Sequence, residues 1–282
     1  MTADRFWTQS YDPGITDLDP STWETTYVDA IQPTFTEFRD KPAFVFMGVE
    51  VTFSELDVYA NRLANMLLDS GLKKGDVVGI NLANIPEYVI AWLGTLRAGC
   101  VVSGVSPLLS AEEMRHQLQD ANAKGLVTLD AVFAKTLSEI IDDLPDLKVI
   151  IAASVGGFLP APKRILGKLL KKIPSGKVTP INGKTVVKIE NIIKTNQYSS
   201  TAPQIDLAPD DTAYIQYTGG TTGLPKGAML SHRNVVADLL IVQDWLRWEK
   251  GKGLALSGFP FFHIAGLFFN KNCIYLGWTQ VL

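Results

Sequence analysis

The sequence is poor in cysteine and histidine, and this scarcity excludes several kinds of site. Its 282 residues include two cysteines, Cys100 and Cys273, and three histidines. Two distant cysteines outside any C-x-x-C pattern form neither a disulfide framework nor a zinc knuckle. They are typical of a protein from a reducing cytosol in which both thiols are buried in the core.

The sequence also lacks a long apolar run, a secretory leader and an excess of positive charge. No apolar run reaches the ~18 residues that a membrane span requires, because Arg97 interrupts the best candidate, Tyr88 to Val105. The beginning of the chain is polar and acidic, which gives no support to secretion. The formal net charge of −3 argues against a nucleic-acid partner. The expected location is the cytoplasm.

The chain from residue 43 to 153 alternates strand-like and helix-like segments. Runs such as DVVGINL and LKVIIAA show little polar alternation, as expected of strands buried on both faces. One helix is predicted to begin at an N-cap Ser54, and another at a capping box of Ser110 and Glu113. Repeated β-α-β units with short links predict an α/β fold with mainly parallel sheets flanked by helices.

Residues 154–203 depart from this alternation and are rich in glycine, proline, lysine and serine. Within them, 160–173 predicts a short helix with an apolar face and a basic face. The apolar face carries Ile165, Leu166, Leu169, Leu170 and Ile173, and the basic face carries Arg164, Lys168, Lys171 and Lys172. Such a helix suits an anionic membrane surface, and the alternative is a helix that caps the domain with a solvated basic face.

These patterns divide the chain into two predicted parts. Residues 1–205 form a first α/β subdomain that includes the basic insertion at about 154–203. Residues 206–282 begin a second α/β subdomain.

The stretch YIQYTGGTTGLPKGAMLSH, residues 214–232, concentrates small, hydroxylated and flexible residues between two strand-like runs. Glycines allow successive backbone N–H groups to converge on an anion. Thr218, Thr221 and Thr222 add hydroxyl groups for phosphate oxygens or Mg²⁺, and Lys226 adds a mobile positive charge. These are the parts of a triphosphate-binding loop, although composition alone leaves a flexible loop without a ligand equally open.

The order of the residues excludes the most familiar phosphate loops. A Walker A motif reads G-x-x-x-x-G-K-[ST], whereas Gly227 directly follows Lys226 here. The GKT at residues 183–185 also fails, because Val178 stands where the first glycine is required. No G-x-G-x-x-G occurs that would suggest a dinucleotide site.

The segment YTGGTTGLPKG closely resembles the phosphate-binding signature of the adenylate-forming, or AMP-binding, superfamily, which includes acyl-CoA synthetases, luciferases and peptide-synthetase adenylation domains. Other stretches resemble the same family in the same order: VTFSELDVYANRLANML, GDVVGINLANIPEYVIAWLGTLRAGCVVSGVSPLLSAEEMRHQL, DDTAYIQYTGGTTG and FPFFHIAG. The resemblance covers residues 25–282. It implies the N-terminal part of the adenylate-forming fold, lacking the C-terminal domain.

Two features resemble the long-chain fatty acyl-CoA synthetase branch of this family. Gly220 follows Gly219 where many relatives read Thr-Ser-Gly, and the basic segment LPAPKRILGKLLKKIP is similar to one in bacterial long-chain enzymes. The implied substrates are a fatty acid, ATP and CoA, with Mg²⁺ as the metal. A fatty acid would be adenylated to acyl-AMP and pyrophosphate, and CoA would then displace AMP. The basic segment would add peripheral contact with the inner face of the membrane.

The resemblance also implies roles for individual residues. The loop would hold the β- and γ-phosphates, Thr221 would contribute to Mg²⁺ binding, and Lys226 would be an electrostatic helper in adenylation. His263 would lie near the reacting carboxylate and the acyl channel, the alternative being a neutral core histidine. His232 is expected to be structural, capping the next helix. The expected nucleotide-binding residues are Thr218, Gly219, Gly220, Thr221, Thr222, Gly223, Lys226 and Gly227.

The later signatures of the family are absent, namely Tyr-Gly-x-Thr-Glu, Thr-Gly-Asp, the hinge arginine and the C-terminal lysine. The chain therefore resembles an N-terminal fragment, and ligase activity is not expected of it alone. One alternative is a ligase for an aryl, medium-chain or luciferase-like acid. Another is a truncated, non-catalytic protein that binds nucleotide or membrane. The sequence leaves open the acyl chain length and whether the protein forms a homodimer, although a strand left unpaired near Leu282 would favour association.

Overall fold

The computed structural model describes residues 5–170, 172–218 and 224–282. The predicted loop residues Gly219 to Gly223, and Lys171 of the predicted basic helix, lie outside the described residues.

The larger of two sheets has seven strands in the order β7-β6-β5-β3-β4-β8-β9. All neighbours are parallel except β8 and β9, which form an antiparallel hairpin. The strands are β3 Val77–Asn81, β4 Val101–Gly104, β5 Ala123–Leu129, β6 Val149–Ala153, β7 Thr185–Lys188, β8 Thr212–Thr218 and β9 Lys226–Ser231. The prediction of an α/β fold with a mainly parallel sheet is confirmed.

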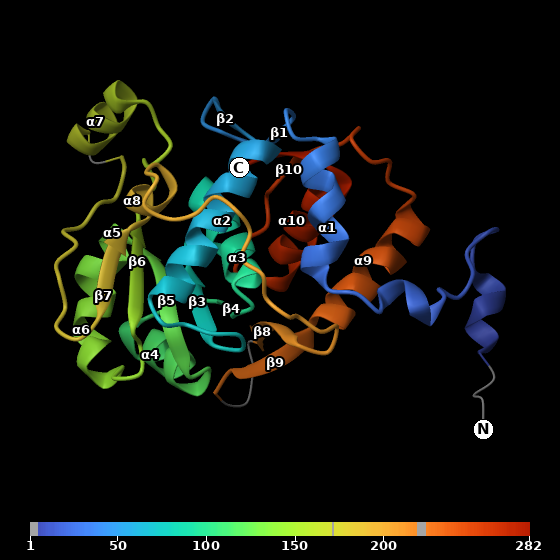
Figure 1. The fold of residues 1–282 in the computed structure, drawn as a ribbon, viewed down its shortest axis with the longest axis horizontal. Coiled ribbons are helices and arrows are strands. Elements are labelled where there is room, and N and C mark those ends of the chain that lie inside the picture. The colour runs from blue at the N-terminus through green and yellow to red at the C-terminus, as the bar shows by residue number, and fades with distance from the viewer. Residues whose placement is uncertain (1–4, 171, 219–223) are drawn as a thin grey trace.

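Helices cover both faces of this sheet (Figure 1). Neighbouring residues of β3 show the alternation, because Val77 packs into one apolar cluster and Val78 into the other. One face carries α2 Phe53–Asp69, α3 Pro86–Arg97 and α8 Ile189–Ile193. The other carries α4 Ala111–Asp120 and a helical stretch made of α5 Asp130–Val132, the π-helical turn Phe133–Leu137, α6 Ser138–Ile140 and the 3-10 turn Ile141–Asp143.

The smaller sheet has four strands in the order β10-β11-β1-β2. These are β1 Pro42–Phe46, β2 Val49–Thr52, β10 Leu254–Leu256 and β11 Thr279–Val281. The hairpin of β1 and β2 turns at Gly48, whose φ is 82°. The expectation of an unpaired strand near Leu282 is wrong, because β11 pairs in parallel with both β1 and β10.

Three further helices form a group in which the first packs against the other two (Figure 1). They are α1 Tyr27–Glu37, α9 His232–Leu246 and α10 Ile264–Leu276, with short 3-10 helices at Phe6–Ser10 and Pro20–Trp23. Both cysteines are free and buried in the core, as expected. None of the helices in the described residues is long and apolar enough to cross a membrane.

Helix starts follow the predicted signals at one position and depart from them at another. Ser110 and Glu113 form the capping box of α4, as predicted. The N-cap prediction at Ser54 is wrong, because Thr52 caps α2 and forms a capping box with Glu55. The side chains of Ser and Thr both accept the N3 amide well, so the sequence pattern is compatible with a helix start at either Thr52 or Ser54.

The predicted basic insertion contains the helix α7, Ala161–Leu169, which stands apart from the sheet at the upper left of Figure 1. Its apolar side faces outward: Ile165, Leu166, Leu169 and Leu170 are 54% to 77% exposed. Ile173 lies beyond the end of the helix and contacts Gly167. Later in the same segment, β7 and α8 resume the β/α alternation and extend the sheet.

The hairpin of β8 and β9 follows the predicted division at residue 205, yet it belongs to the same sheet as the strands before it. The two-part division stays a prediction.

Candidate functional site

The β8–β9 hairpin presents both ends of the predicted phosphate loop at the same edge of the larger sheet. Thr218 ends β8 and pairs with Lys226 at the start of β9. The Thr218 hydroxyl donates to the Lys226 carbonyl oxygen at 3.4 Å, and both side chains are exposed. Because β8 runs parallel to β4, Thr218 and Lys226 lie at the carboxyl edge of the parallel strands, where open α/β sheets bind ligands.

Close packing under the hairpin explains why Gly227 is a glycine. A Cβ at this position would lie 2.6 Å from Cγ2 of Ile215 and 3.2 Å from the ring of Tyr217. The Tyr217 hydroxyl donates to Asp120 at 2.6 Å, at the end of α4. Burial, together with this carboxylate, raises the pKa of Tyr217, which therefore stays protonated at neutral pH. The hairpin is thus fixed to α4.

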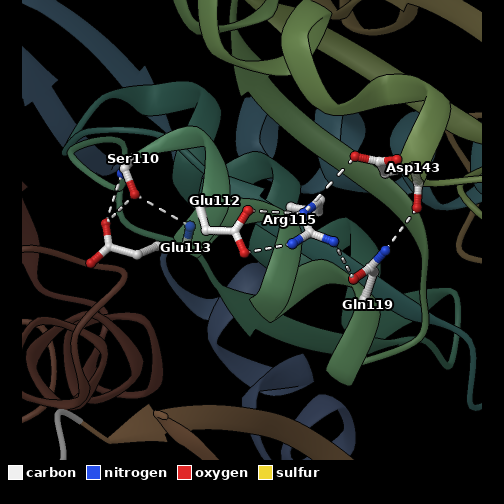
Figure 2. Close-up of polar contacts among 6 residues, drawn as sticks. All are labelled: Ser110, Glu112, Glu113, Arg115, Gln119 and Asp143. Carbon is white, nitrogen blue, oxygen red and sulfur yellow. Dashed lines mark hydrogen bonds and ion pairs between the residues drawn. The ribbon is translucent and has the colours of Figure 1, made fainter.

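Helix α4 borders a hollow beside the described end of the loop. A cavity of about 290 Å³ lies between it and the segment Leu224–Pro225. Figure 2 shows that Arg115 is bracketed by Glu112 and Asp143, while Ser110 and Glu113 form the capping box. Two carboxylates offset the charge of Arg115, so α4 adds no uncompensated positive charge here. Among the described residues of the hairpin, Lys226 carries the positive charge that a phosphate would require.

His263 lies in a different segment and caps a helix. It is the N-cap of α10, where its Nδ1 accepts the amide of Ala265 at 3.2 Å. The side chain is exposed rather than enclosed by core residues. This arrangement leaves Nε2 available to a ligand, and it disfavours the alternative of a neutral core histidine.

Contacts from two strands hold the backbone before His263 against the sheet edge. Gln216 of β8 donates to the Phe262 carbonyl oxygen at 3.2 Å. A Cβ on Gly104, at the end of β4, would lie 2.5 Å from the same oxygen. The structure thus brings the His263 segment beside the β8–β9 hairpin, which carries Thr218, Lys226 and Gly227.

The segment before α10 has a second support that sequence reasoning missed. Asn84, between β3 and α3, donates to the carbonyl oxygens of Ser257 and Phe259 at 3.0 and 2.8 Å and accepts the Phe261 amide at 2.9 Å. The hydroxyl of Tyr88 donates to the Phe261 carbonyl oxygen at 2.8 Å. An asparagine following a strand gives only a weak signal, because turn asparagines are common for local reasons.

His232 is structural, although it does not cap the helix that was expected. Its Nδ1 accepts the backbone amide of Tyr27 at 3.3 Å, at the start of α1, whereas Ser231 caps α9. Burial lowers the pKa of His232 to about 4, so it is neutral at pH 7.

An apolar pocket lies between β8, β9, α9 and α10. Its volume is about 300 Å³, at the small end of the usual range for ligand sites. The first residue of α10, Ile264, follows His263 directly and lines this pocket. The walls are formed by Tyr214, Leu230, Asn234, Val235, Asp238, Ile264, Leu267, Phe268 and Lys271.

Comparisons with known proteins agree with this geometry. A family model described as "AMP-binding enzyme" matches residues 31–282. A long-chain-fatty-acid–CoA ligase of Escherichia coli O157:H7 is 33% identical over 274 residues, which cover 96% of this chain and 48% of that protein. A long-chain-fatty-acid–CoA ligase of Bacillus subtilis (strain 168) is 38% identical over 251 residues, covering 87% of this chain and 44% of that protein.

Solved structures show the same fold at lower identity. The anthranilate CoA ligase AuaEII in complex with anthranoyl-AMP has a TM-score of 0.76 at 21% identity, covering 94% of this chain and 46% of that one. A long-chain-fatty-acid-CoA ligase (FadD1) from Archaeoglobus fulgidus has a TM-score of 0.75 at 20% identity, covering 96% and 49%. The chain spans about half the length of the curated relatives that it matches. It belongs to the AMP-binding enzyme family of adenylate-forming enzymes.

Proposed function

We propose that the protein containing this chain is a long-chain fatty acid–CoA ligase. It adenylates a fatty acid with ATP, releasing pyrophosphate, and then transfers the acyl group from AMP to the thiol of CoA. The observation that carries this proposal is the mainly apolar pocket beside His263, because a long acyl chain needs apolar walls leading away from its reacting carboxylate. The curated relatives named above bear this activity in their names.

We infer a different role for each of the described residues at the sheet edge. Lys226 offsets the negative charge that develops as pyrophosphate leaves, and it acts beside the phosphates rather than as the principal catalytic lysine. His263, held through Nδ1 by the Ala265 amide, presents Nε2 to the acyl carboxylate. Gln216 and Asn84 position its segment without touching the substrate.

The nucleotide contacts that we propose extend beyond the described residues. The assignments of Gly219, Gly220, Thr221, Thr222 and Gly223 to phosphate binding stay predictions. We assign Mg²⁺ to the phosphates of ATP and the Thr221 hydroxyl, since this ion commonly takes one or two protein oxygens together with phosphate and water. When bound, it would neutralise phosphate charge.

The pocket assignment is tested by filling it. Ile264 lines the pocket and is 44% exposed, so Ile264→Trp places a ring in the cavity without overpacking the core. We expect hexadecanoate to bind roughly tenfold or more weakly to this variant in a fluorescent fatty-acid displacement assay. Ile241→Trp is the matched control, because Ile241 is 47% exposed and lies outside the pocket lining. Equal binding by both variants would contradict the assignment.

Two alternatives from the sequence have distinct outcomes, one in the displacement assay and the other in an assay of acyl-CoA formation. A ligase for an aryl acid would bind anthranilate or a similar ring acid in preference to hexadecanoate. A non-catalytic nucleotide- or membrane-binding protein would give no acyl-CoA even as the complete protein. We further propose that residues 1–282 alone do not form acyl-CoA. Product formation by this chain, lost on Thr221→Ala, would overturn that statement.

The proposed location is the cytoplasm, with α7 resting on the inner face of the membrane. Four exposed apolar side chains on α7 support this location, because a helix that merely capped the domain would bury them. The described cations Lys163 and Lys172 are exposed beside them, and Arg164 is partly exposed, so the segment suits an anionic bilayer surface. A homodimer also stays a proposal, to be measured by light scattering.

A further inference from the structure

A lysine lies in the wall of the apolar pocket. Lys271 belongs to α10, whose other pocket-lining residues are Ile264, Leu267 and Phe268. Only 5% of Lys271 is exposed, and burial lowers its pKa while the nearby Asp238 carboxylate raises it. A buried ammonium is costly unless it is fully paired, so its partners determine what the pocket can hold.

The position of the ammonium is fixed by helix α9. Lys271 Nζ donates to the carboxylate of Asp238 and to the carbonyl oxygen of Val235 at 3.3 Å. Asp238 and Val235 are three positions apart and therefore share one face of α9. Nζ also lies 5.7 Å from the ring centroid of Phe268, another pocket residue. The ammonium is thus held at the pocket wall.

The ammonium of this pocket-lining lysine has more hydrogen-bond donors than it has acceptors among the described residues. A lysine ammonium carries three N–H donors, and the described residues supply two hydrogen-bond acceptors to Lys271, one on Asp238 and one on Val235. Tyr214, also in the pocket wall, accepts the indole N–H of Trp92 at 3.0 Å. No acceptor for the Tyr214 hydroxyl hydrogen is found in the described part of the chain. A hydrocarbon chain in this pocket would satisfy neither donor.

We propose that Lys271 is a specificity-determining residue that favours acyl chains carrying an oxygen acceptor over unsubstituted chains. This inference rests on the proposed function, because it takes the pocket to be the acyl site. A hydroxyl, oxo or second carboxylate group on the chain accepts the remaining N–H of Lys271. The pairing with Asp238 keeps the ammonium charged and in place while the pocket is empty.

The test compares chain preference rather than affinity alone. Hexadecanoate, its ω-hydroxy derivative and its ω-carboxy derivative are titrated into residues 1–282 by calorimetry or probe displacement. The wild type is expected to prefer the oxygenated acids, and Lys271→Met to reduce that preference roughly tenfold or more, as for loss of a hydrogen bond to a charged group. Lys252→Met is the matched control, because Lys252 pairs with Glu249 on the surface.

A second variant separates specificity from helix packing. Asp238→Asn keeps the lysine and a side-chain oxygen that accepts its N–H, but removes the anion that pairs with the ammonium. Preference for the oxygenated acids is therefore expected to persist, most for the ω-carboxy acid, whose second carboxylate replaces the lost charge. If Lys271 only joined α9 to α10, both variants would lower the melting temperature and leave the preference unchanged. That result, with hexadecanoate still bound, would overturn this inference alone. If none of the three acids binds the wild type, the acyl-pocket assignment fails as well.

Discussion

At the scale of single residues, Arg97 shows how the core accommodates a charge. Its side chain is 2% exposed. The guanidinium forms an ion pair with Asp57 Oδ1 at 2.7 Å and donates a hydrogen bond to Asn61 Oδ1 at 2.7 Å. The guanidinium also lies 4.7 Å from the ring centroid of Phe35. The residue that interrupts the longest apolar run thus joins α3 to α2 rather than marking a surface.

Removing the carboxylate that pairs with Arg97 should be strongly destabilising. Asp57→Ala leaves a buried guanidinium without its anion, and we expect a loss of about 3 kcal/mol in the free energy of unfolding. Asp69→Ala, on the exposed part of the same helix, should change it by less than about 0.5 kcal/mol. Urea denaturation of the two variants measures the difference, and equal losses would contradict the role of the buried pair.

Glu87 makes the stability of the protein depend on pH. It is 1% exposed, and neither carboxyl oxygen has a hydrogen-bond partner in the described residues. Burial raises its pKa from 4.5 to about 8. Between these values the folded state keeps the proton that the unfolded state releases, so this group's contribution falls as pH rises, by about 1.4 kcal/mol per pH unit.

Glu87→Gln should remove that dependence. The variant is expected to match the wild type near pH 4.5 and to become progressively more stable than it towards pH 8, as measured by urea denaturation across this range. Glu139→Gln, at an exposed position, serves as the control and should follow the wild type. A constant difference between Glu87→Gln and the wild type at every pH would show that Glu87 does not titrate in this way.

At the scale of elements, local signals predicted some structures well and others poorly. The capping box at Ser110 is a short-range feature and is found where predicted, whereas the N-cap predicted at Ser54 lies at Thr52. In the segment GLALSGFPFF the strand is limited to Leu254–Leu256, because Asn84 holds the following residues as a loop. That contact joins residues far apart in the sequence, which local propensity does not encode.

The support from Asn84 should govern the order of the segment before His263. Asn84→Ala removes both the donor to two carbonyl oxygens and the acceptor of the Phe261 amide, and we expect the hydrogen exchange of that amide to accelerate roughly tenfold or more. Asn65→Ala is the control, because Asn65 also donates to backbone carbonyl oxygens but does so at Ser199 and Thr201. Faster exchange at Phe261 in both variants would point to general destabilisation instead.

Helix α7 is the element whose role the membrane proposal depends on. Leu169→Glu places a negative charge among its exposed apolar residues and should weaken binding to vesicles of phosphatidylcholine with phosphatidylserine by roughly tenfold. Leu256→Glu, at an equally exposed leucine on β10, should leave binding unchanged in a sedimentation assay. If neither variant differs from the wild type, α7 does not contact the bilayer.

At the scale of the whole molecule, the sequence predicted the layered α/β architecture but not how the ends of the chain meet. Buried apolar strands between helices require parallel neighbours, so the central sheet followed from pattern alone. The smaller sheet could not be predicted in this way, because the pairing of Phe44 with Gln280 joins residues far apart in the sequence. Likewise, the motifs indicated Lys226 and His263 as site residues. The pocket and its Lys271 were not predicted, because they depend on the packing of α9 against α10.

The proposed function requires that this sheet edge activates a long-chain fatty acid with ATP. The most direct test is acid-dependent exchange of pyrophosphate into ATP by the complete protein that contains the chain, with hexadecanoate and anthranilate compared. We predict exchange with hexadecanoate, little with anthranilate, and a loss of about a hundredfold on Lys226→Ala. Exchange that requires anthranilate, or that is unchanged by Lys226→Ala, would contradict the claim.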